Sequence, residues 1–532
     1  MAYYRDLREH IAVLEAKGKL VRIKRLINKD TELMPLVRWQ FRGLPEEERK
    51  TFLFENVTDV KGRRYRMPVL VASHAASTEV YAIGMMCKPE EIQARWTQAQ
   101  LHPIEAVMTE TGPIHEEVHV GDSLVQHGGL EEIPVPISTP GFDNAPYFTC
   151  ANWLSKDIDT GIRNLGNYRA MIKSQTRTGL QCQVGQHVRV HWEKCRVRGI
   201  PLQAAIVIGA MPAIGYTAGA KVTYGVDEYA VAGGIAGSPI ELVKCKTVDL
   251  EVPAGAELVI EGEIPTDSLE REAPFGEFTG YMGEESTCLY FNVTGITHRK
   301  DAMYNAFLSQ FPPSESSKLK SLGRAANWFK LLRHDRGIPG VVSCAFPENG
   351  SGSGEALCVI QMKKFHPSDS WSALNAAASF VANWPRVFIA VDDDIDPWDT
   401  DAILWAISFR VDPQRDVRVL KGKAYALDQA VAPPTVTEAE RVWPWPEGAS
   451  ALMIDATRKW PYRPVSLPRK DFMERAKEIW EEEGLPKLKP RAPWHGYDLG
   501  VWTEENQEEA DLALQGEHFK TGEKLAQRRV KL

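Results

Sequence analysis

The residue types best suited to bind an ion lie in two neighbouring stretches, GIRNLGNYRAMI and QCQVGQHVRVHW. Asn164, His187 and His191 stand there among glycines and β-branched residues, a pattern that favours strands. An amide oxygen and an imidazole on neighbouring strands can reach one ion. In a strand, His187 and His191 would point the same way about 13 Å apart. We therefore expect one of them to be a ligand, with hydrogen-bonded side chains on a barrel surface as the alternative.

A carboxylate pair precedes the small, glycine-rich stretch AVAGG. Asp227 and Glu228 stand in GVDEYAVAGG, where a carboxylate could complete a site for a hard, oxygen-preferring ion. By itself this pair is also what a turn at the surface would show, so the default expectation is that Glu228 is a solvated turn residue.

Acidic residues also surround a turn in EREAPFGEFTGYMGE. Pro274 and Gly276 force a turn between Glu272 and Glu277, so both carboxylates can converge beside Phe275. Such a carboxyl group is suited to general-acid catalysis. An acidic surface hairpin would have the same pattern.

The elements that must position these side chains change in character along the chain. Residues 5–18 have the spacing of an amphipathic helix. Between about 120 and 310, short β-branched runs separated by Gly and Pro predict an antiparallel barrel or sandwich. After 317, helix-like and strand-like segments alternate, which predicts an α/β layer with a largely parallel sheet. We expect units at 1–120, 121–315, 316–465 and 466–532, the last a charged helix and extension.

Composition excludes several classes of protein. The chain has 532 residues, of which 43% are hydrophobic and 25% charged, and its net charge of −8 opposes a nucleic-acid or anionic-membrane role. No apolar run reaches the ~18 residues of a membrane span, and MAYYRDLREH lacks a signal core. The eight cysteines are scattered, which fits reduced thiols. We expect a cytoplasmic protein without sulfur-bound metal.

Several motifs occur together in one order: NLGNYR, GQH, DEYAVAGG, AELVIEGEI, APFGEFTGY, DDDIDPWDTDAILWAISFRVDP and IDATRKWP. In this the chain resembles the UbiD family of prenylated-FMN-dependent decarboxylases, over roughly residues 5–465. The resemblance implies an α/β multidomain fold. An N-terminal α/β domain, a central split β-barrel that binds flavin and a C-terminal α/β domain with an oligomerising helix are expected.

The resemblance also implies a site. Asn164, His187 and Glu228 would hold a divalent ion, Mn²⁺ or Mg²⁺ with Fe²⁺ as a further candidate, against the cofactor phosphate, with K⁺ nearby. Arg169, Glu272 and Glu277 match the catalytic set. The cofactor would be contacted by Asn164, Asn167, Tyr168, Arg169, Gln181, Cys182, Gln183, Gln186, His187 and Glu228.

The implied activity is reversible, non-oxidative decarboxylation of an aromatic or conjugated acid, or its CoA thioester, through a covalent prenylated-FMN adduct. Glu277 would donate the proton, supported by the Arg169–Glu272 pair. The alternative is a non-catalytic flavin-binding subunit of a multi-component carboxylase. A flavin prenyltransferase would supply the cofactor, and a homodimer or homohexamer is expected, with no nucleic-acid partner and no membrane span.

One stretch departs from the family pattern. Many members carry a lysine just before IDAT that reaches the cofactor phosphate, whereas this chain has Ala449, Ser450 and Ala451. We expect the phosphate to depend more on the metal or on another cation such as Lys459.

Overall fold

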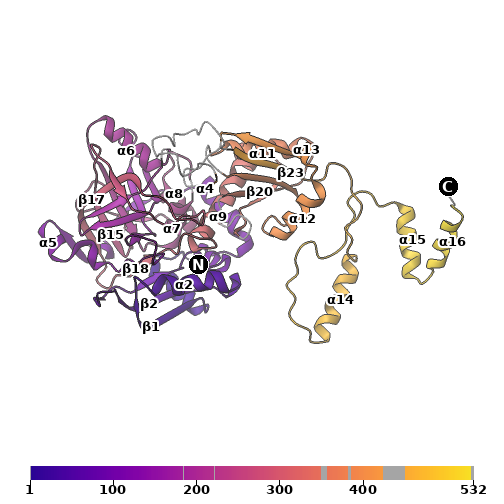
Figure 1. Ribbon diagram of the computed structural model, residues 1–532, viewed down its shortest axis with the longest axis horizontal. Helices are drawn as coiled ribbons and strands as arrows, with labels where there is room; N and C mark the ends of the chain where they lie inside the picture. The colour runs from indigo at the N-terminus through magenta and orange to yellow at the C-terminus, as the bar shows by residue number, and fades with distance from the viewer. Residues whose placement is uncertain are drawn as a thin grey trace.

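The computed structural model describes residues 2–183, 185–220, 222–348, 356–381, 385–422, 430 and 450–528. Figure 1 shows a large body built from the N-terminal and central parts of the chain, with the C-terminal sheet beside it. The last helices, drawn in yellow, extend away from both. The residues outside this description include 423–429 and 431–449, and Ala449 is the last residue of the second range.

The N-terminal lobe is a small sheet packed against helices. Its strand order is β1-β2-β4-β18, with β3 on β2. Leu7, Ile11 and Leu14 of the first helix are buried, and the Asp6 side chain caps it by accepting from the Glu9 amide, so the helix predicted over 5–18 is confirmed. The elements are α1 (Leu7–Ala16), β1 (Leu20–Asn28), α2 (Leu33–Gly43), η1 (Glu46–Glu48), β2 (Thr51–Thr58), β3 (Arg64–Tyr65), β4 (Val69–Val71), α3 (Thr78–Met85), η2 (Pro89–Glu91), α4 (Ile92–Leu101) and β18 (Tyr304–Ala306).

The central sheet returns to the hairpin with which it begins. Its order is β7-β10-β11-β17-β15-β12-β8-β9, and β6 and β16 also pair with β17. Strands β7 and β8 are successive parts of one hairpin arm, and β9 and β10 are successive parts of the other. The sheet therefore curls around a core that includes Trp153, Ile206 and Phe291. The strands are β6 (Glu117–Val120), β7 (Tyr147–Phe148), β8 (Asn152–Lys156), β9 (Arg163–Asn167), β10 (Ala170–Ser174), β11 (Arg177–Leu180), β12 (Leu202–Ile208), β15 (Leu258–Ile264), β16 (Glu270–Glu272) and β17 (Ser286–His298).

One predicted strand of this region is wrong. HVRVHW lies in helix α6 (His187–Val197), whose buried residues are Val188, His191, Trp192 and Cys195. Their spacing of three, four and seven places them on one helical face, which packs against the barrel. The valines suggested a strand, but burial of this face decides for the helix.

Further helices and a small sheet cover the barrel. The order β14-β13-β5 forms the small sheet. Its strands are β5 (Val107–Met108), β13 (Glu241–Lys244) and β14 (Glu251–Pro253), and the helices are α5 (Asp122–Gln126), α7 (Pro212–Gly219) and α8 (Glu228–Ala236), with η3 (Pro113–His115) and η4 (Gly129–Glu132).

The C-terminal domain has a mixed sheet of order β19-β20-β21-β23-β22. The central pairings β20–β21 and β21–β23 are parallel, as the alternating pattern predicts, whereas the edge strands β19 and β22 pair antiparallel. The elements are α9 (Glu315–Lys330), η5 (Leu331–Asp335), β19 (Val341–Ala345), β20 (Leu357–Met362), α11 (Asp369–Ser379), β21 (Val387–Asp392), α12 (Thr400–Arg410), α13 (Pro413–Asp416), β22 (Val417–Lys421) and β23 (Ser450–Ala456).

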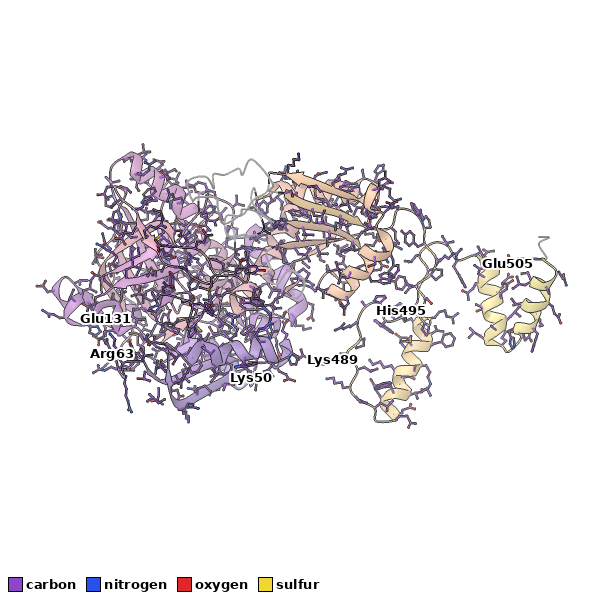
Figure 2. All side chains as sticks on the ribbon, viewed as in Figure 1. Lys50, Arg63, Glu131, Lys489, His495 and Glu505 are labelled. Carbon is purple, nitrogen blue, oxygen red and sulfur yellow. The ribbon has the colours of Figure 1, made fainter. Side chains whose placement is uncertain are left out.

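The C-terminal extension carries three helices, α14 (Lys470–Glu482), α15 (Glu504–Leu514) and α16 (His518–Ala526). They have no buried residues, and Figure 2 shows His495 and Glu505 on this arm, away from the body. An ion pair between Lys489 and Glu47 connects the arm to the N-terminal lobe. Across the described residues, every helix is too short or too polar to cross a bilayer.

Candidate active site

Arg169 lies at a break in the barrel wall. It stands in the short gap between β9 and β10, where the pairing partner changes from β8 to β7. The guanidinium donates from Nε to Oε1 of Glu272 over 2.8 Å and forms a second ion pair with Glu277. Because the regular pairing is interrupted here, the side chain can turn toward the two carboxylates that the sequence places more than 100 residues away.

Glu272 is held by the edge of the sheet. It ends β16, pairs with Ser286 of β17 and is completely buried. Its carboxylate packs on Gly179 of β11, where an added Cβ would lie 2.6 Å from Glu272 Oε2. A residue with a side chain at position 179 would therefore displace this carboxylate.

Glu277 lies on the predicted turn. Its amide donates to Tyr281 O over 2.8 Å, and the Gly283 amide donates to Phe275 O over 2.8 Å, which closes the loop. Phe275 is buried, with the Arg169 guanidinium 5.2 Å from its ring centroid and the Tyr147 ring 4.4 Å away. The two carboxylates do converge beside an aromatic ring, and the acidic surface hairpin is not what forms.

Asp143 is a neighbour that the sequence analysis missed. Its Oδ1 accepts from the Gly276 amide over 3.3 Å and its Oδ2 from the Thr139 amide over 2.7 Å. Burial raises the pKa of Asp143 to about 6, although these amides and Arg169 oppose the shift. The aspartate thus ties a preceding loop to the turn that carries Glu277. Nothing in GFDNAPY distinguishes it from an ordinary turn residue.

A second cluster joins three elements of the barrel domain. Asn164 of β9 and His187, the first residue of α6, are 3.1 Å apart from Oδ1 to Nδ1. Glu228 is the first residue of α8 and its Oε2 accepts from the amide of Leu165, next to Asn164, over 2.9 Å. The default expectation of a solvated Glu228 is wrong, since only 3% of it is exposed.

The donor set of this cluster suits a divalent ion. Burial raises the pKa of Glu228 to about 8. Among the described residues its carboxylate forms no ion pair with Lys or Arg, and Arg163 pairs instead with the preceding Asp227, over 2.7 Å. A buried carboxylate without a cation is costly. An ion that also accepts an amide oxygen and an imidazole nitrogen would remove that cost.

His191 is engaged elsewhere. Its Nδ1 is 2.9 Å from Ser155 Oγ and its Nε2 4.0 Å from Asp157 Oδ2. Burial lowers the pKa of His191 to about 4. The structure therefore places His187, and not His191, beside Asn164. A cavity of about 50 Å³ lies against Asn164 and both histidines.

Buried polar atoms between the two clusters lack partners. Asn167 donates from Nδ2 to Thr149 O over 3.1 Å, but its Oδ1, like Gln181 Oε1, accepts no hydrogen bond from a described residue. Orphaned buried acceptors of this kind fit a ligand with N–H or O–H donors. Gln183 and Gln186 bond to each other, the Gln183 amide donating to Gln186 Oε1 over 2.8 Å.

The two remaining residues assigned to the cofactor are also placed in this region. Tyr168 accepts at its backbone oxygen from Trp153 Nε1 over 3.0 Å, and burial raises the pKa of the Cys182 thiol to about 12. The thiol is thus kept neutral.

Lys459 is already occupied within the C-terminal domain. Its Nζ donates to Asp455 O over 2.7 Å and to Thr457 O over 2.6 Å, and lies 3.5 Å from Asp416 Oδ2. These contacts hold the ammonium within its own domain. Ala451, near which the family lysine is missing, is buried in β23.

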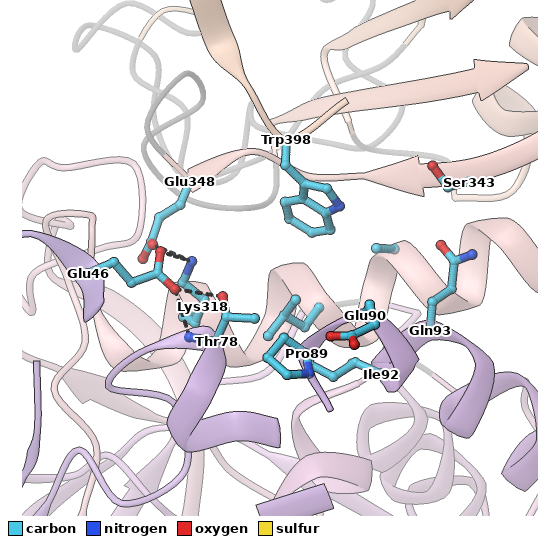
Figure 3. A pocket seen from close by; sticks show the side chains of 12 residues that line it. Glu46, Thr78, Pro89, Glu90, Ile92, Gln93, Lys318, Ser343, Glu348 and Trp398 are labelled. Atoms are coloured by element: carbon cyan, nitrogen blue, oxygen red, sulfur yellow. Dashed lines mark hydrogen bonds and ion pairs between the residues drawn. The ribbon is translucent and has the colours of Figure 1, made fainter. Parts of the chain in front are cut away.

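A larger cavity, about 460 Å³, lies between the N-terminal helices and the C-terminal sheet (Figure 3). Lys318 bridges Glu46 and Glu348 at its edge, over 2.8 and 2.9 Å, below Trp398. Burial raises the pKa of Glu46, but the charge of Lys318 and the bonds from Thr78 outweigh it and lower the pKa to about 2. None of the described residues that line the cavity belongs to the two clusters.

Comparison with known proteins identifies the family. Residues 105–311 match the Rift-related domain of 3-octaprenyl-4-hydroxybenzoate carboxy-lyase, and residues 319–456 match its C-terminal domain. An uncharacterized protein of Aquifex aeolicus is 31% identical over 511 residues, which cover 91% of this chain and 99% of that protein. The chain belongs to the UbiD family. It is a carboxy-lyase, as the family description states.

Solved structures of UbiD-class enzymes share the fold. An evolved dimeric form of HmfF from Pelotomaculum thermopropionicum in complex with prFMN is 28% identical, with a TM-score of 0.76 and coverage of 89% of this chain and 100% of that one. The closed form of vanillic acid decarboxylase from Sedimentibacter hydroxybenzoicus is 25% identical, with a TM-score of 0.76 and coverage of 91% and 99%. These matches confirm the α/β multidomain fold class predicted from the UbiD resemblance.

Proposed function

We propose that this UbiD-family chain catalyses reversible, non-oxidative decarboxylation of an aromatic or conjugated carboxylic acid, or its CoA thioester. The observation that carries the proposal is the bridge formed by Arg169 between Glu272 and Glu277. Glu277 is the proton donor and the Arg169–Glu272 pair its support. A similar protein that decarboxylates vanillic acid favours an aromatic acid.

The charges of the bridge suit proton transfer. One guanidinium faces two carboxylates, so the cluster has one negative charge in excess. When Glu277 carries a proton, Glu272 still neutralises Arg169. The side chain of Glu272 is completely buried, whereas that of Glu277 is 11% exposed. Glu277 can therefore carry a proton without leaving a buried cation unpaired. It gives that proton to the carbon from which carbon dioxide departs.

The surroundings of the bridge keep water from the reacting groups. Phe275 is buried against the guanidinium, and Tyr147 is buried against the Phe275 ring. Prenylated FMN, when bound, supplies the covalent electron sink for the substrate, and the protein orients, desolvates and protonates. Gln181 and Asn167, with their unpaired acceptors, are suited to bind the flavin.

Asn164, His187 and Glu228 would hold the divalent ion, Mn²⁺ or Mg²⁺ with Fe²⁺ as a further candidate, and K⁺ would lie nearby. The support is the convergence of an amide oxygen, an imidazole and a buried carboxylate that lacks a cation among the described residues. A flavin prenyltransferase would supply the cofactor, and α14 would contribute to a homodimer or homohexamer.

The alternative is a non-catalytic flavin-binding subunit. Such a chain has no need to retain Arg169, Glu272 and Glu277 in contact, and their contact here favours the enzyme.

The test is production of the chain together with a flavin prenyltransferase, followed by absorbance and mass spectrometry of the bound cofactor. Benzoates, heteroaromatic acids, cinnamates and aromatic CoA thioesters are then screened for carbon dioxide release. Prenylated FMN with one divalent ion per chain and release from at least one acid is the expected result. Bound cofactor without release or ¹³C-bicarbonate exchange from any acid would favour the subunit.

A further inference from the structure

Three histidines from separate segments meet where β6 pairs with the end of β17. His119 belongs to β6, His298 ends β17, and His127 directly follows α5. One ring nitrogen of each lies within 4.8 Å of the others. The rings of His119 and His127 stack with centroids 3.7 Å apart. In Figure 1 this place is at the end of the body where α5 projects, beside β17.

The sheet itself brings two of the rings together. In the antiparallel β6–β17 pair, His119 is opposite Ile296, so His298 is its diagonal neighbour on the same face. Their Nε2 atoms are 3.1 Å apart. A tetrahedral zinc with bonds of about 2.0–2.1 Å would require ligand nitrogens about 3.3 Å apart. The pair is thus near ligand spacing before any ion binds.

A backbone contact fixes the tautomer of His298. Its Nδ1 is 2.7 Å from the carbonyl oxygen of Arg299, and a carbonyl only accepts, so Nδ1 carries the hydrogen. The Nε2 of the neutral ring then presents a lone pair toward His119. A histidine that binds a metal through one ring nitrogen usually donates a hydrogen bond from the other, often to a backbone carbonyl.

His127 is the third histidine of the cluster. It is exposed, whereas His119 is half-buried and His298 buried, so its ring can rotate the remaining distance without disturbing the core. Glu132 lies within electrostatic range of His119 and forms an ion pair with Arg63, labelled in Figure 2 beside Glu131. Glu117 of β6 also lies within electrostatic range of His119, so two carboxylates near the rings attract a cation.

We propose that His119, His127 and His298 form a binding site for a borderline divalent ion of the Zn²⁺ class, with a water molecule as fourth ligand. Three imidazoles suit Zn²⁺, Co²⁺ or Ni²⁺ better than the harder Mn²⁺ or Mg²⁺. The ion would tie α5 and the loop after it to the β6–β17 edge of the barrel. This site is separate from the Asn164 cluster and does not depend on the proposed decarboxylation.

The test is a Zn²⁺ titration of the full-length holoprotein against a chromogenic chelator. One tight Zn²⁺ per chain is expected, and His127→Ala and His119→Gln should each weaken its binding at least tenfold. His102→Ala, which changes an exposed histidine outside the cluster, should leave it unchanged. His187→Ala should also retain it, which separates this site from the proposed active-site ion.

Two further readouts sharpen the result. Co²⁺ should give the visible absorption of a tetrahedral or five-coordinate nitrogen site, without the near-ultraviolet charge-transfer band that a cysteine ligand would add. Zn²⁺ should slow hydrogen exchange over 119–130 in the wild type but not in His127→Ala. A titration without a tight site, or with one that ignores both His119 and His127, would overturn the proposal.

Discussion

The two clusters of the candidate active site balance their buried charge in opposite ways. Arg169 lies between Glu272 and Glu277, so most of that charge is neutralised by the protein itself. Glu228 is buried with an amide and an imidazole nearby, but among the described residues without a cationic partner. The first cluster is thus assembled without any ligand, whereas the second is stable as a charged site only with an added cation.

The same contrast recurs outside the site in two carboxyls, the half-buried Glu46 and the buried Glu315. Glu46 is paired with Lys318, which brings its pKa down to about 2. Glu315, at the start of α9, accepts backbone amides from Ala72, His74 and Leu308, and burial raises its pKa to about 7. In these two carboxyls the difference lies in the nearby cation, which Glu46 has in Lys318.

The largest expected effect is on turnover, through the proposed proton donor Glu277. Glu277→Gln should lower turnover by about 10²- to 10⁴-fold, because the amide keeps the shape but has no transferable proton. Cofactor content, measured by absorbance, should stay at the wild-type level. Glu285→Gln, at an exposed ion pair with Arg271, is the matched control. Wild-type turnover in Glu277→Gln would remove Glu277 as the acid.

Removing Arg169 should leave its two carboxylates without a cation, as Glu228 is in the second cluster. Arg169→Met leaves two buried carboxylates unpaired, so the free energy of unfolding at pH 8 should fall by about 3 kcal/mol. Adding Glu272→Gln to this variant should restore part of the loss. Chemical denaturation of the cofactor-free protein measures both. If Arg169→Met were as stable as Arg271→Met, the bridge would contribute nothing to folding.

The second cluster should respond to its ion. His187→Ala removes one of the three proposed ligands, so the affinity for Mn²⁺ should fall by roughly 10- to 100-fold. Flavin content should fall in parallel. Calorimetric titration and metal analysis of the purified holoprotein give both numbers. His191→Ala is the matched control, since His191 bonds Ser155 instead. Stoichiometric metal and flavin in His187→Ala would contradict the assignment.

The smallest expected effect is on the pH dependence of stability, through the buried Glu315. The folded pKa of Glu315, about 7, is above its ordinary value of 4.5, so the folded state holds this proton more tightly and stability is lost as pH rises from 4.5 to 7. Wild type should therefore gain stability over Glu315→Gln, by on the order of 1 kcal/mol, when pH falls from 8 to 5.

The pKa of Glu46 is shifted in the opposite direction from that of Glu315. Its folded pKa, about 2, is depressed, so its contribution is complete above pH 4.5 and is lost only as pH falls below that value. The stability gap between wild type and Glu46→Gln should stay flat from pH 5 to 8. Melting temperatures over this range test both carboxyls, and equal slopes for the two variants would contradict the contrast.

Much of the architecture follows from local pattern. The helix at 5–18, the strands of the barrel and the alternation after 317 are periodic in the sequence and form as predicted. HVRVHW failed because its valines have strand propensity, while the burial of Trp192 and Cys195 on one face selects a helix. Local propensity is a small energy, and the packing of a whole face exceeds it.

The residue types of the site were determined by the sequence itself: the carboxylates around Pro274 and Gly276, the Asn164–Arg169 stretch, and His187. Which of them meet was decided only by the tertiary structure. In the folded protein Glu228 is buried and His191 bonds Ser155. Lys459 bonds within its own domain, and Asp143 accepts from Gly276 in the turn that carries Glu277. The physical reason is that burial and charge neutralisation depend on neighbours distant in the chain. Those neighbours come together only once the central sheet has curled around its core.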